Sequence, residues 1–313
     1  MTVVPVEADV DAAPGLLEGA MSLQLSPQTC NLEYWLSAVA QGTLRGMARH
    51  GHRPEAVTPS WMRQDGPLRD ALIEEFAFRS IAEEKATRAL SYLVLHAPDT
   101  DTMEFFATQL IDEARHASVF RGHLRELGVT DLAGTVERVA GADRDRVLVP
   151  LEEFGLPLGR DYGDFVGGVI VLTVLVEGVL APAAELSERK WRLLDPAAAE
   201  IERAAGVDEI RHLSVGSSVV KQHLAAHPED LPRLKDLIDR GRAMWADLPV
   251  LDMILRRERL FQDGMQQLTT VIGDYELAPG IRLIDTTPED RLVMAATWSQ
   301  EMQDGRLSYM GLV

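Results

Sequence analysis

Apolar residues recur at helical spacing through most of the chain, and turn residues divide them into long segments. The pattern predicts a helix over 68–96 that ends before Pro98, and another over 100–127 that is capped by Asp99 and followed by Gly128. A shorter helical segment is expected over 130–148. An apolar core helix is expected over 162–194, with a kink at Pro182, and a helix over 196–226 begins after Asp195.

The flanking regions carry weaker patterns. Residues 1–25 read as a loosely structured lead-in, 27–50 as a helix, and 229–303 as further helices. Only 281–285 suggests short strands. We therefore predict an all-α protein in which residues 1–313 form a single domain, with a bundle at about 68–226 and additional helices at both ends.

Composition narrows the class of protein. Apolar residues make up 46% of the 313 residues, and the net charge is −18, which argues against nucleic acid or an anionic membrane as a partner. The single cysteine, Cys30, excludes a disulfide framework within the chain. The apolar run from Phe165 to Ala184 is long enough to suggest a membrane span, but Glu177 interrupts it, so a buried core helix is expected. No signal peptide is apparent, and we expect a cytoplasmic protein.

Two copies of one pattern, D-E-x-R-H, carry the chemistry. They are Asp112–His116 and Asp208–His212. In each copy Glu and His are three residues apart, so on a helix they share one face. A carboxylate oxygen beside an imidazole nitrogen suits a first-row transition metal. The two pairs predict Glu113, His116, Glu209 and His212 as metal ligands.

A further carboxylate precedes each pair by about the same distance. Glu177 stands alone in an apolar helix, 32 residues before Glu209, where an unpaired charge would be costly; the alternative is a Glu paired with a core Arg or Lys. Glu83 lies 30 residues before Glu113 and borders the apolar face of its helix, whereas Glu84 lies across it with Arg88 one turn on. We therefore predict that Glu83, and not Glu84, is the metal ligand of this helix. Four carboxylates and two histidines in this order are typical of a di-metal site in a four-helix bundle.

The Asp and Arg residues of each motif are expected to support the metal ligands. A histidine that binds metal usually donates its second N–H to a carboxylate. Asp112 and Asp208 are placed to do so, each for the histidine of the opposite motif, with Arg115 and Arg211 compensating their charge. The alternative, that all four are ordinary helix-surface charges, fits their duplication less well.

At these residues the chain resembles the ferritin-like di-iron oxygenases, including the hydroxylase subunits of bacterial multicomponent monooxygenases and their ribonucleotide reductase relatives. Its length and layout resemble the smaller di-iron N-oxygenases of natural-product pathways, of the isobutylamine N-hydroxylase type. The resemblance covers about residues 68–226 and implies two Fe ions, O2 as co-substrate, and oxidation of a small molecule. It does not identify the substrate.

Departures from these relatives exclude some roles. Phe120 occupies the place of the reductase's radical tyrosine, Ala205 the place of an extra histidine in aryl-amine N-oxygenases, and Ala181 the place of a threonine in methane and toluene hydroxylases. Thr173 is a candidate for that threonine's role or for capping a backbone carbonyl. Helical spacing suggests a substrate pocket or, equally, ordinary core packing for Phe120, Val174, Gly178, Ala181, Gly167 and Gly168. His123, two turns after His116, is expected at the surface or core edge rather than as a ligand.

The resemblance leads to an O2-dependent di-iron monooxygenase, with N-oxygenation of an amine as one reaction. The alternatives are C–H hydroxylation or desaturation of an acyl or aromatic substrate, a ferritin-like ferroxidase, and a noncatalytic bundle. The sequence lacks a dinucleotide fingerprint, a flavin motif and a cysteine cluster, so a separate reductase or ferredoxin is expected to supply electrons. The sequence leaves open whether the protein forms a homodimer.

Overall fold

The protein is described by a computed structural model that covers residues 5–39 and 50–313, and the all-α prediction is confirmed. The α-helices of the described residues are α1 (Leu16–Ser22), α2 (Leu32–Ala38), α3 (Pro67–His96), α4 (Thr100–Glu126), α5 (Leu132–Asp143), α6 (Val149–Arg160), α7 (Phe165–Ile170), α8 (Gly178–Trp191), α9 (Pro196–Ala226), α10 (Leu231–Asp247), α11 (Val250–Met265), α12 (Thr269–Ile272) and α13 (Pro288–Met310). The shorter elements are the 3-10 helices η1 (Val6–Ala8), η2 (Ser60–Arg63), η5 (Pro228–Asp230), η6 (Gln266–Leu268) and η7 (Leu283–Asp285), the π-helices η3 (Arg144–Leu148) and η4 (Val171–Glu177), and the antiparallel strands β1 (Glu276–Ala278) and β2 (Ile281–Arg282).

The long helices begin and end where their local chemistry predicts. The side chain of Asp99 accepts a hydrogen bond from Thr102 N at 2.8 Å at the start of α4, and Asp195 accepts one from Ala198 N at 3.2 Å at the start of α9. Gly128, just beyond α4, has φ +87°, a backbone conformation that glycine adopts without a steric penalty.

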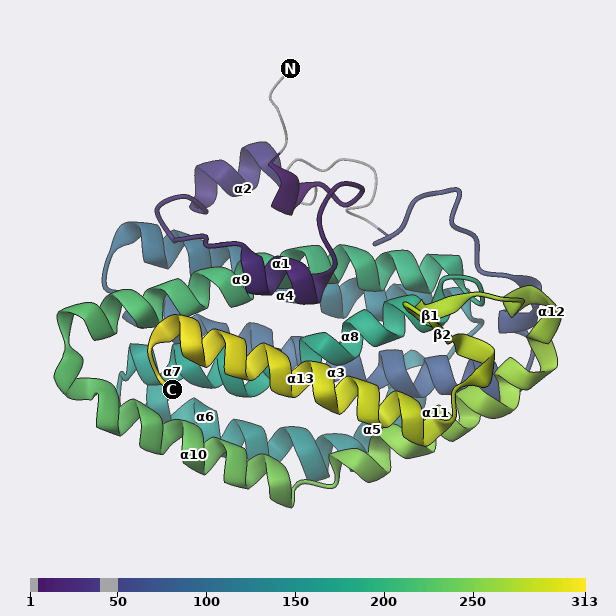
Figure 1. The fold of residues 1–313 in the computed structure, drawn as a ribbon. Helices are drawn as coiled ribbons and strands as arrows, with labels where there is room; N and C mark the ends of the chain where they lie inside the picture. Colours follow the sequence, from purple (N-terminus) through teal and green to yellow (C-terminus); the bar gives the residue numbers. More distant parts are fainter. Residues whose placement is uncertain (1–4, 40–49) are drawn as a thin grey trace.

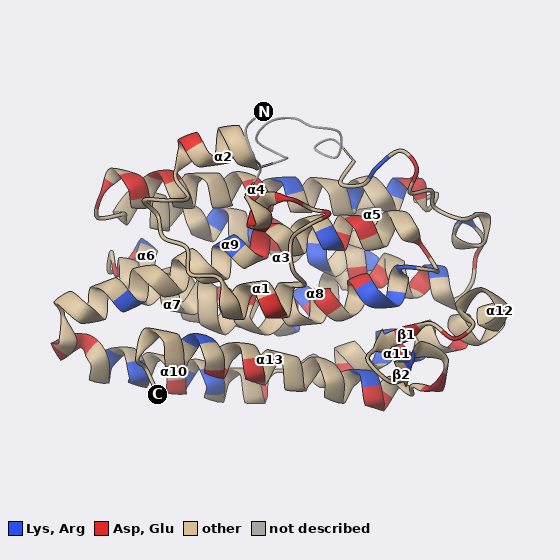
Figure 2. Cartoon of the chain, turned by 45° about the horizontal axis from the view of Figure 1, so that its top comes forward, with Lys and Arg blue, Asp and Glu red and all other residues tan. Residues whose placement is uncertain are grey.

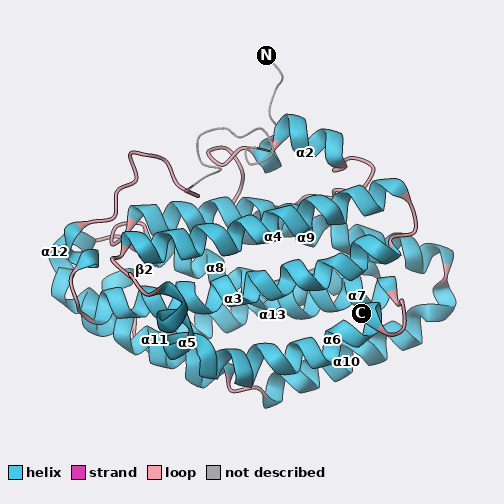
Figure 3. Ribbon diagram, turned by 180° about the vertical axis from the view of Figure 1, so that it is seen from behind, coloured by secondary structure: helices cyan, strands magenta, loops and turns pink. Residues whose placement is uncertain are grey.

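Long helices pack side by side around the middle of the molecule (Figure 1). Helix α3 packs along α4, α8 packs along α9, and α4 also contacts α9. Helices α11 and α13 cover α3 and α8, and the view from behind shows the same arrangement (Figure 3). Segments far apart in sequence therefore enclose one interior region.

The apolar segment expected over 162–194 is one continuous helical run, α7–η4–α8. Its most apolar window has a mean hydropathy of 2.2, and 72% of that window is buried inside the protein. This burial is that of a core helix. The run contains the π-helical turns of η4, and Pro182 lies inside α8.

The two ends of the chain differ from expectation. In the lead-in, the described residues 5–25 are more ordered than predicted: α1 packs on α9, with Leu16 and Ala20 buried, and Leu16 N donates to Glu185 Oε2 at 2.8 Å. The helix expected over 27–50 is, in the described part, only α2; residues 40–49 lie outside the described residues. Helix α13 continues past the expected end at 303. Strand β2 begins at 281 as expected, whereas β1 lies before that position.

Charged residues of both signs are interspersed along the outer helices α10 and α13 (Figure 2). Several of them form ion pairs at the surface, such as Arg242 with Asp304 at 2.8 Å. Exposed pairs of this kind each contribute little to stability, typically below about 1 kcal/mol. The excess of carboxylates that matters for function lies in the interior.

Candidate metal centre

Four helical segments bring the six predicted ligands together. Helix α3 supplies Glu83, and η4 supplies Glu177 at its last position; α4 and α9 each supply one Glu–His pair. Two groups of potential ligand atoms result, each with its atoms within 4.8 Å of one another: Glu113, Glu177, Glu209 and His212 form one, and Glu83, Glu113 and His116 form the other. Glu113 belongs to both groups, so it occupies the position of a bridging carboxylate.

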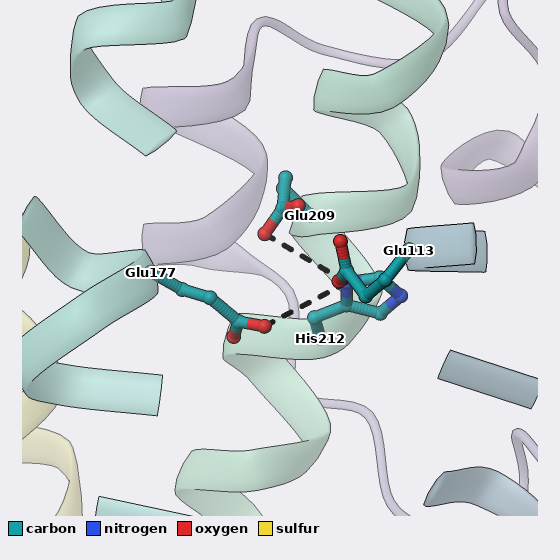
Figure 4. Close-up of side chains that lie close together, drawn as sticks. All are labelled: Glu113, Glu177, Glu209 and His212. Atoms are coloured by element: carbon teal, nitrogen blue, oxygen red, sulfur yellow. Dashed lines mark ion pairs between the residues drawn. The ribbon is translucent and has the colours of Figure 1, made fainter. Parts of the chain in front are cut away.

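The larger group is centred on His212 (Figure 4). Its Nδ1 lies 3.1 Å from Glu113 Oε1, 3.7 Å from Glu209 Oε2 and 4.0 Å from Glu177 Oε1. All four side chains are buried. One nitrogen and three carboxylate oxygens converge on a single interior point.

The smaller group lies on the other side of Glu113. Nδ1 of His116 lies 3.2 Å from Glu113 Oε2, and the two histidine ring centroids are 6.4 Å apart. Glu83 is half-buried and belongs to this group, whereas the neighbouring Glu84 is exposed and pairs with Arg88 at 2.9 Å. The structure thus places Glu83, not Glu84, at the site.

Each histidine meets the aspartate of the opposite motif. Nε2 of His116 lies 3.1 Å from Asp208 Oδ2, and Nε2 of His212 lies 3.5 Å from Asp112 Oδ2. Because these contacts use the nitrogens that face away from the cluster, they leave Nδ1 of each ring directed at the carboxylates. The cross-motif arrangement expected from the sequence is therefore present in the geometry.

The two arginines compensate these buried aspartates. Arg115 donates to Asp208 at 2.7 Å, and Arg211 donates to Asp208 at 2.6 Å and to Asp112 at 3.1 Å. Although burial raises the pKa of Asp208, Arg211 and His116 hold that pKa far below its usual range. Asp208 therefore stays ionised, as a partner of an imidazole N–H must be.

The protein alone does not balance the charge of the four glutamates. Burial, together with the neighbouring Glu113, raises the pKa of Glu83 well above its usual value, and burial with Glu209 does the same for Glu177. Burial also raises the pKa of Glu113, but the adjacent imidazoles of His116 and His212 outweigh it and lower that pKa. Like charges this close cannot all ionise without added positive charge.

Unpartnered atoms test whether a metal fits. Among the described residues, Glu113 Oε1, Glu177 Oε2, Glu209 Oε2 and both ring nitrogens of His212 are buried without a hydrogen bond of acceptable geometry. Buried polar atoms in native proteins are nearly always satisfied. Oxygen and imidazole donors are the ligands that iron accepts, so the donor set fits a pair of such cations.

Sequence reasoning missed two polar neighbours of the ligands. Gln109, one turn before Glu113, donates through Nε2 to Glu177 Oε1 at 2.6 Å, and Trp35 of α2 donates through Nε1 to Asp112 at 3.1 Å. The spacing of Gln109 on α4 could have indicated it, because it shares the inward face with Glu113. Trp35 lies far away in sequence and gave no such signal.

The π-helical stretch η4 was also not predicted. It ends at Glu177, and π-helical turns occur mostly at functional sites because the extra residue per turn redirects side chains. Since Glu177 and its apolar neighbours show the same composition in an α- or a π-helix, hydrophobic periodicity carried no sign of it.

A cavity opens onto the glutamates. It has a volume of about 150 Å³, and its lining includes Glu83, Glu113, Glu177 and Glu209. Ala181 and Ala205, the two alanines that replace larger residues of the related enzymes, also line it. Their small side chains leave space beside the ligands.

Three other residues suggested for the pocket lie elsewhere, so the prediction is corrected. Phe120 packs edge-on against Phe76 with ring centroids 4.8 Å apart, and the carbonyl of Val174 accepts a hydrogen bond from Gln303 at 3.1 Å. Gly178 lies against the backbone carbonyl of Thr173. Each of these residues lies on the face of its helix that packs against another helix. Helical spacing predicts which residues share a face, but it does not predict whether that face meets a cavity or a neighbouring helix. Gly168 lines a second, adjoining cavity, whereas Gly167 lies at the N-terminus of α7, where Asp164 accepts a hydrogen bond from its N–H.

Thr173 and His123 have packing roles. The Thr173 side chain faces Gly216 of α9: a Cβ at Gly216 would lie 2.1 Å from Thr173 Oγ1. His123 is more buried than expected, with Nε2 3.0 Å from Asp195 Oδ2. It joins α4 to the start of α9 and, as expected, is not in either ligand group.

No known family model matches the chain. The site and fold alone therefore define its class: a helical protein with a buried cluster of carboxylates and histidines that could hold metal ions.

Proposed function

We propose that this chain is an O2-dependent di-iron monooxygenase of the ferritin-like kind that oxidises a small organic molecule. The observation that carries the proposal is the pair of ligand groups that share Glu113, with buried oxygen and nitrogen atoms left unpartnered. Two bound ferrous ions would supply the electrons and open coordination positions for O2 reduction.

The residues of the chain have separable roles in this proposal. Glu83 and His116 would hold one ion, Glu177, Glu209 and His212 would hold the other, and Glu113, which belongs to both groups, would serve both. Asp112 and Asp208 fix the two imidazole rings, and Gln109 holds the carboxylate of Glu177 in place. The apolar walls of the cavity exclude water from this region.

The cavity favours an oxygenase over an iron-storage protein. A ferroxidase needs a path for ions, whereas the space beside the glutamates is lined mostly by Ala, Leu, Val, Ile and Met side chains, as in pockets that bind organic molecules. N-oxygenation of an amine remains part of the proposal through the sequence resemblance. A separate reductase or ferredoxin would supply the electrons.

Anaerobic loading with Fe(II) tests the proposal. We expect two irons per chain and a transient visible absorption band after O2 is added; Glu177→Ala should bind fewer than two irons per chain and show no such band. The exposed Glu84→Ala variant is the matched control and keeps both. Failure to bind iron, or iron binding unchanged in Glu177→Ala, would contradict the proposal.

A further inference from the structure

The cavity has a charged end that the metal centre does not use. Beyond the four glutamates, its lining includes Arg79 of α3, Lys190 of α8, and Arg257 and Glu258 of α11, together with Glu75. These residues come from three helices and face one enclosed space. Buried cations in a ligand cavity are costly unless paired, so their partners are informative.

Most of these charges are neutralised within the protein. Lys190 and Arg291 both donate to Glu258, and Arg79 pairs with Glu202 at 2.8 Å. Glu75 accepts a hydrogen bond from Trp191 Nε1 at 3.3 Å. These contacts leave little spare capacity at the carboxylates.

Arg257 is the exception. Among the described residues it forms one ion pair, with Asp143 at 3.2 Å, and that carboxylate is bound more closely by Arg256 at 2.6 Å. Its Nε is buried without a hydrogen-bond partner. Burial lowers the pKa of Arg257 despite the nearby Asp143, but an arginine stays protonated in proteins. A charged guanidinium with a free N–H therefore borders the cavity.

Arg257 packs against α3, the helix that supplies Glu83. Its guanidinium carbon lies 4.7 Å from the centre of the Phe78 ring. Phe78 precedes Glu83 by five residues, which corresponds to about 7.5 Å along a helix axis. A molecule held at Arg257 would reach the glutamates with atoms several bonds away from its anchored end.

A second, apolar cavity adjoins the first. It has a volume of about 100 Å³, and its lining includes Ala89, Leu93, Leu151 and Gly168. It shares five lining residues with the first cavity: Ala82, Ala86, Leu172, Val176 and Leu180. The two cavities therefore adjoin at a wall of small and aliphatic side chains.

We propose that the substrate is an amphipathic carboxylate, whose head is bound by Arg257 beside Lys190 and whose aliphatic chain runs past the glutamates into the apolar cavity. A carboxylate accepts hydrogen bonds from a guanidinium and would give the buried Nε of Arg257 the partner it lacks in the described residues. The inference rests on the proposed function for its reaction, but the binding site itself does not require metal.

Binding to the metal-free protein tests it, with decanoate as the probe and titration calorimetry as the measurement. We expect decanoate to bind at least tenfold more tightly than butanoate, decylamine or decanol. Arg257→Gln should weaken decanoate binding at least tenfold, and Arg257→Lys, which keeps the charge, by less. Arg259→Gln, an exposed arginine of the same helix that is outside the cavity lining and does not contact Asp143, is the matched control and should leave the affinity within threefold.

The chain position is tested with Ala86→Phe at the shared wall. This variant should reduce decanoate affinity toward that of butanoate, while Ala225→Phe on an exposed part of α9 should not. Equal binding of decanol and decanoate, or unchanged decanoate affinity in a folded Arg257→Gln variant, would overturn the inference. Because no iron is present, either result leaves the iron-loading test of the proposed function independent.

Discussion

The Oδ2 atom of Asp208, in the second D-E-x-R-H motif, lies 3.1 Å from Nε2 of His116 in the first motif. The contact joins α9 to α4 across the metal centre. It also fixes which imidazole nitrogen faces the glutamates, because Nδ1 is the one left on their side. The duplicated motif is thus a reciprocal arrangement in which each half orients the other.

Asp208→Asn is expected to weaken Fe(II) binding by about 10–100-fold, the usual effect of losing a carboxylate that orients a metal-binding histidine. The amide can still accept a hydrogen bond but no longer carries the charge that Arg115 and Arg211 compensate. Competition with a chelator measures the affinity. Asp161→Asn, an exposed aspartate paired with Arg160, is the control, and an unchanged affinity in a folded Asp208→Asn variant would refute the role.

Removal of the shared glutamate should affect both metal positions. Glu113→Ala is expected to reduce iron from two per chain to less than one, because Glu113 is in both ligand groups. Glu83→Ala should retain one iron, since only the smaller group contains Glu83. Metal analysis after anaerobic desalting gives the counts. Two irons retained in Glu113→Ala would show that the carboxylate does not bridge.

Much of this site followed from local rules. The Glu–x–x–His spacing, the isolated Glu177 and the inward border position of Glu83 depend only on helix geometry and on the cost of buried charge. The structure brings these residues together in two ligand groups. The starts of the two motif-bearing helices could likewise be predicted from the capping residues near Asp99 and at Asp195.

What could not be predicted depends on contacts between distant segments. Trp35 reaches Asp112 from a helix 77 positions earlier, and Phe120 is directed at Phe76 instead of the cavity. Arg257 reaches the ligand cavity from α11, far beyond the bundle that the motifs define. A helical period gives the face of a side chain but not the helix that meets it.

His123 predicts a dependence of stability on pH that is separate from the metal ligands. Burial lowers its pKa, but hydrogen bonds to Asp195 and Glu126 outweigh this and raise it to about 9. Because the folded pKa is above the unfolded value of about 6.5, the stabilisation is complete below about pH 6.5 and is lost as the pH rises through about 9.

We expect His123→Ala to lower the free energy of unfolding by roughly 2–3 kcal/mol at pH 6 and by clearly less at pH 9.5. Urea unfolding of both proteins at the two pH values measures the difference. Other titrating groups are common to both proteins and cancel in the comparison. A difference that stays constant between the two pH values would exclude a charged His123 in the folded protein.

The contact between Thr173 and Gly216 predicts a compensating pair of substitutions. A Cβ at position 216 would lie 2.1 Å from Thr173 Oγ1 and 3.0 Å from its Cγ2, closer than real atoms approach. Gly216→Ala should therefore destabilise the protein by about 1–3 kcal/mol, since overpacking forces η4 and α9 apart.

Thr173→Ala removes both clashing atoms, so the double variant should recover most of that loss. The melting temperatures of the four proteins form a double-mutant cycle. Gly206→Ala on the same helix, where an added Cβ would lie 3.9 Å from Leu16 Cβ, is the control and should not lower the melting temperature. Additive effects of the two substitutions would show that η4 and α9 are not held at this distance by Thr173 and Gly216.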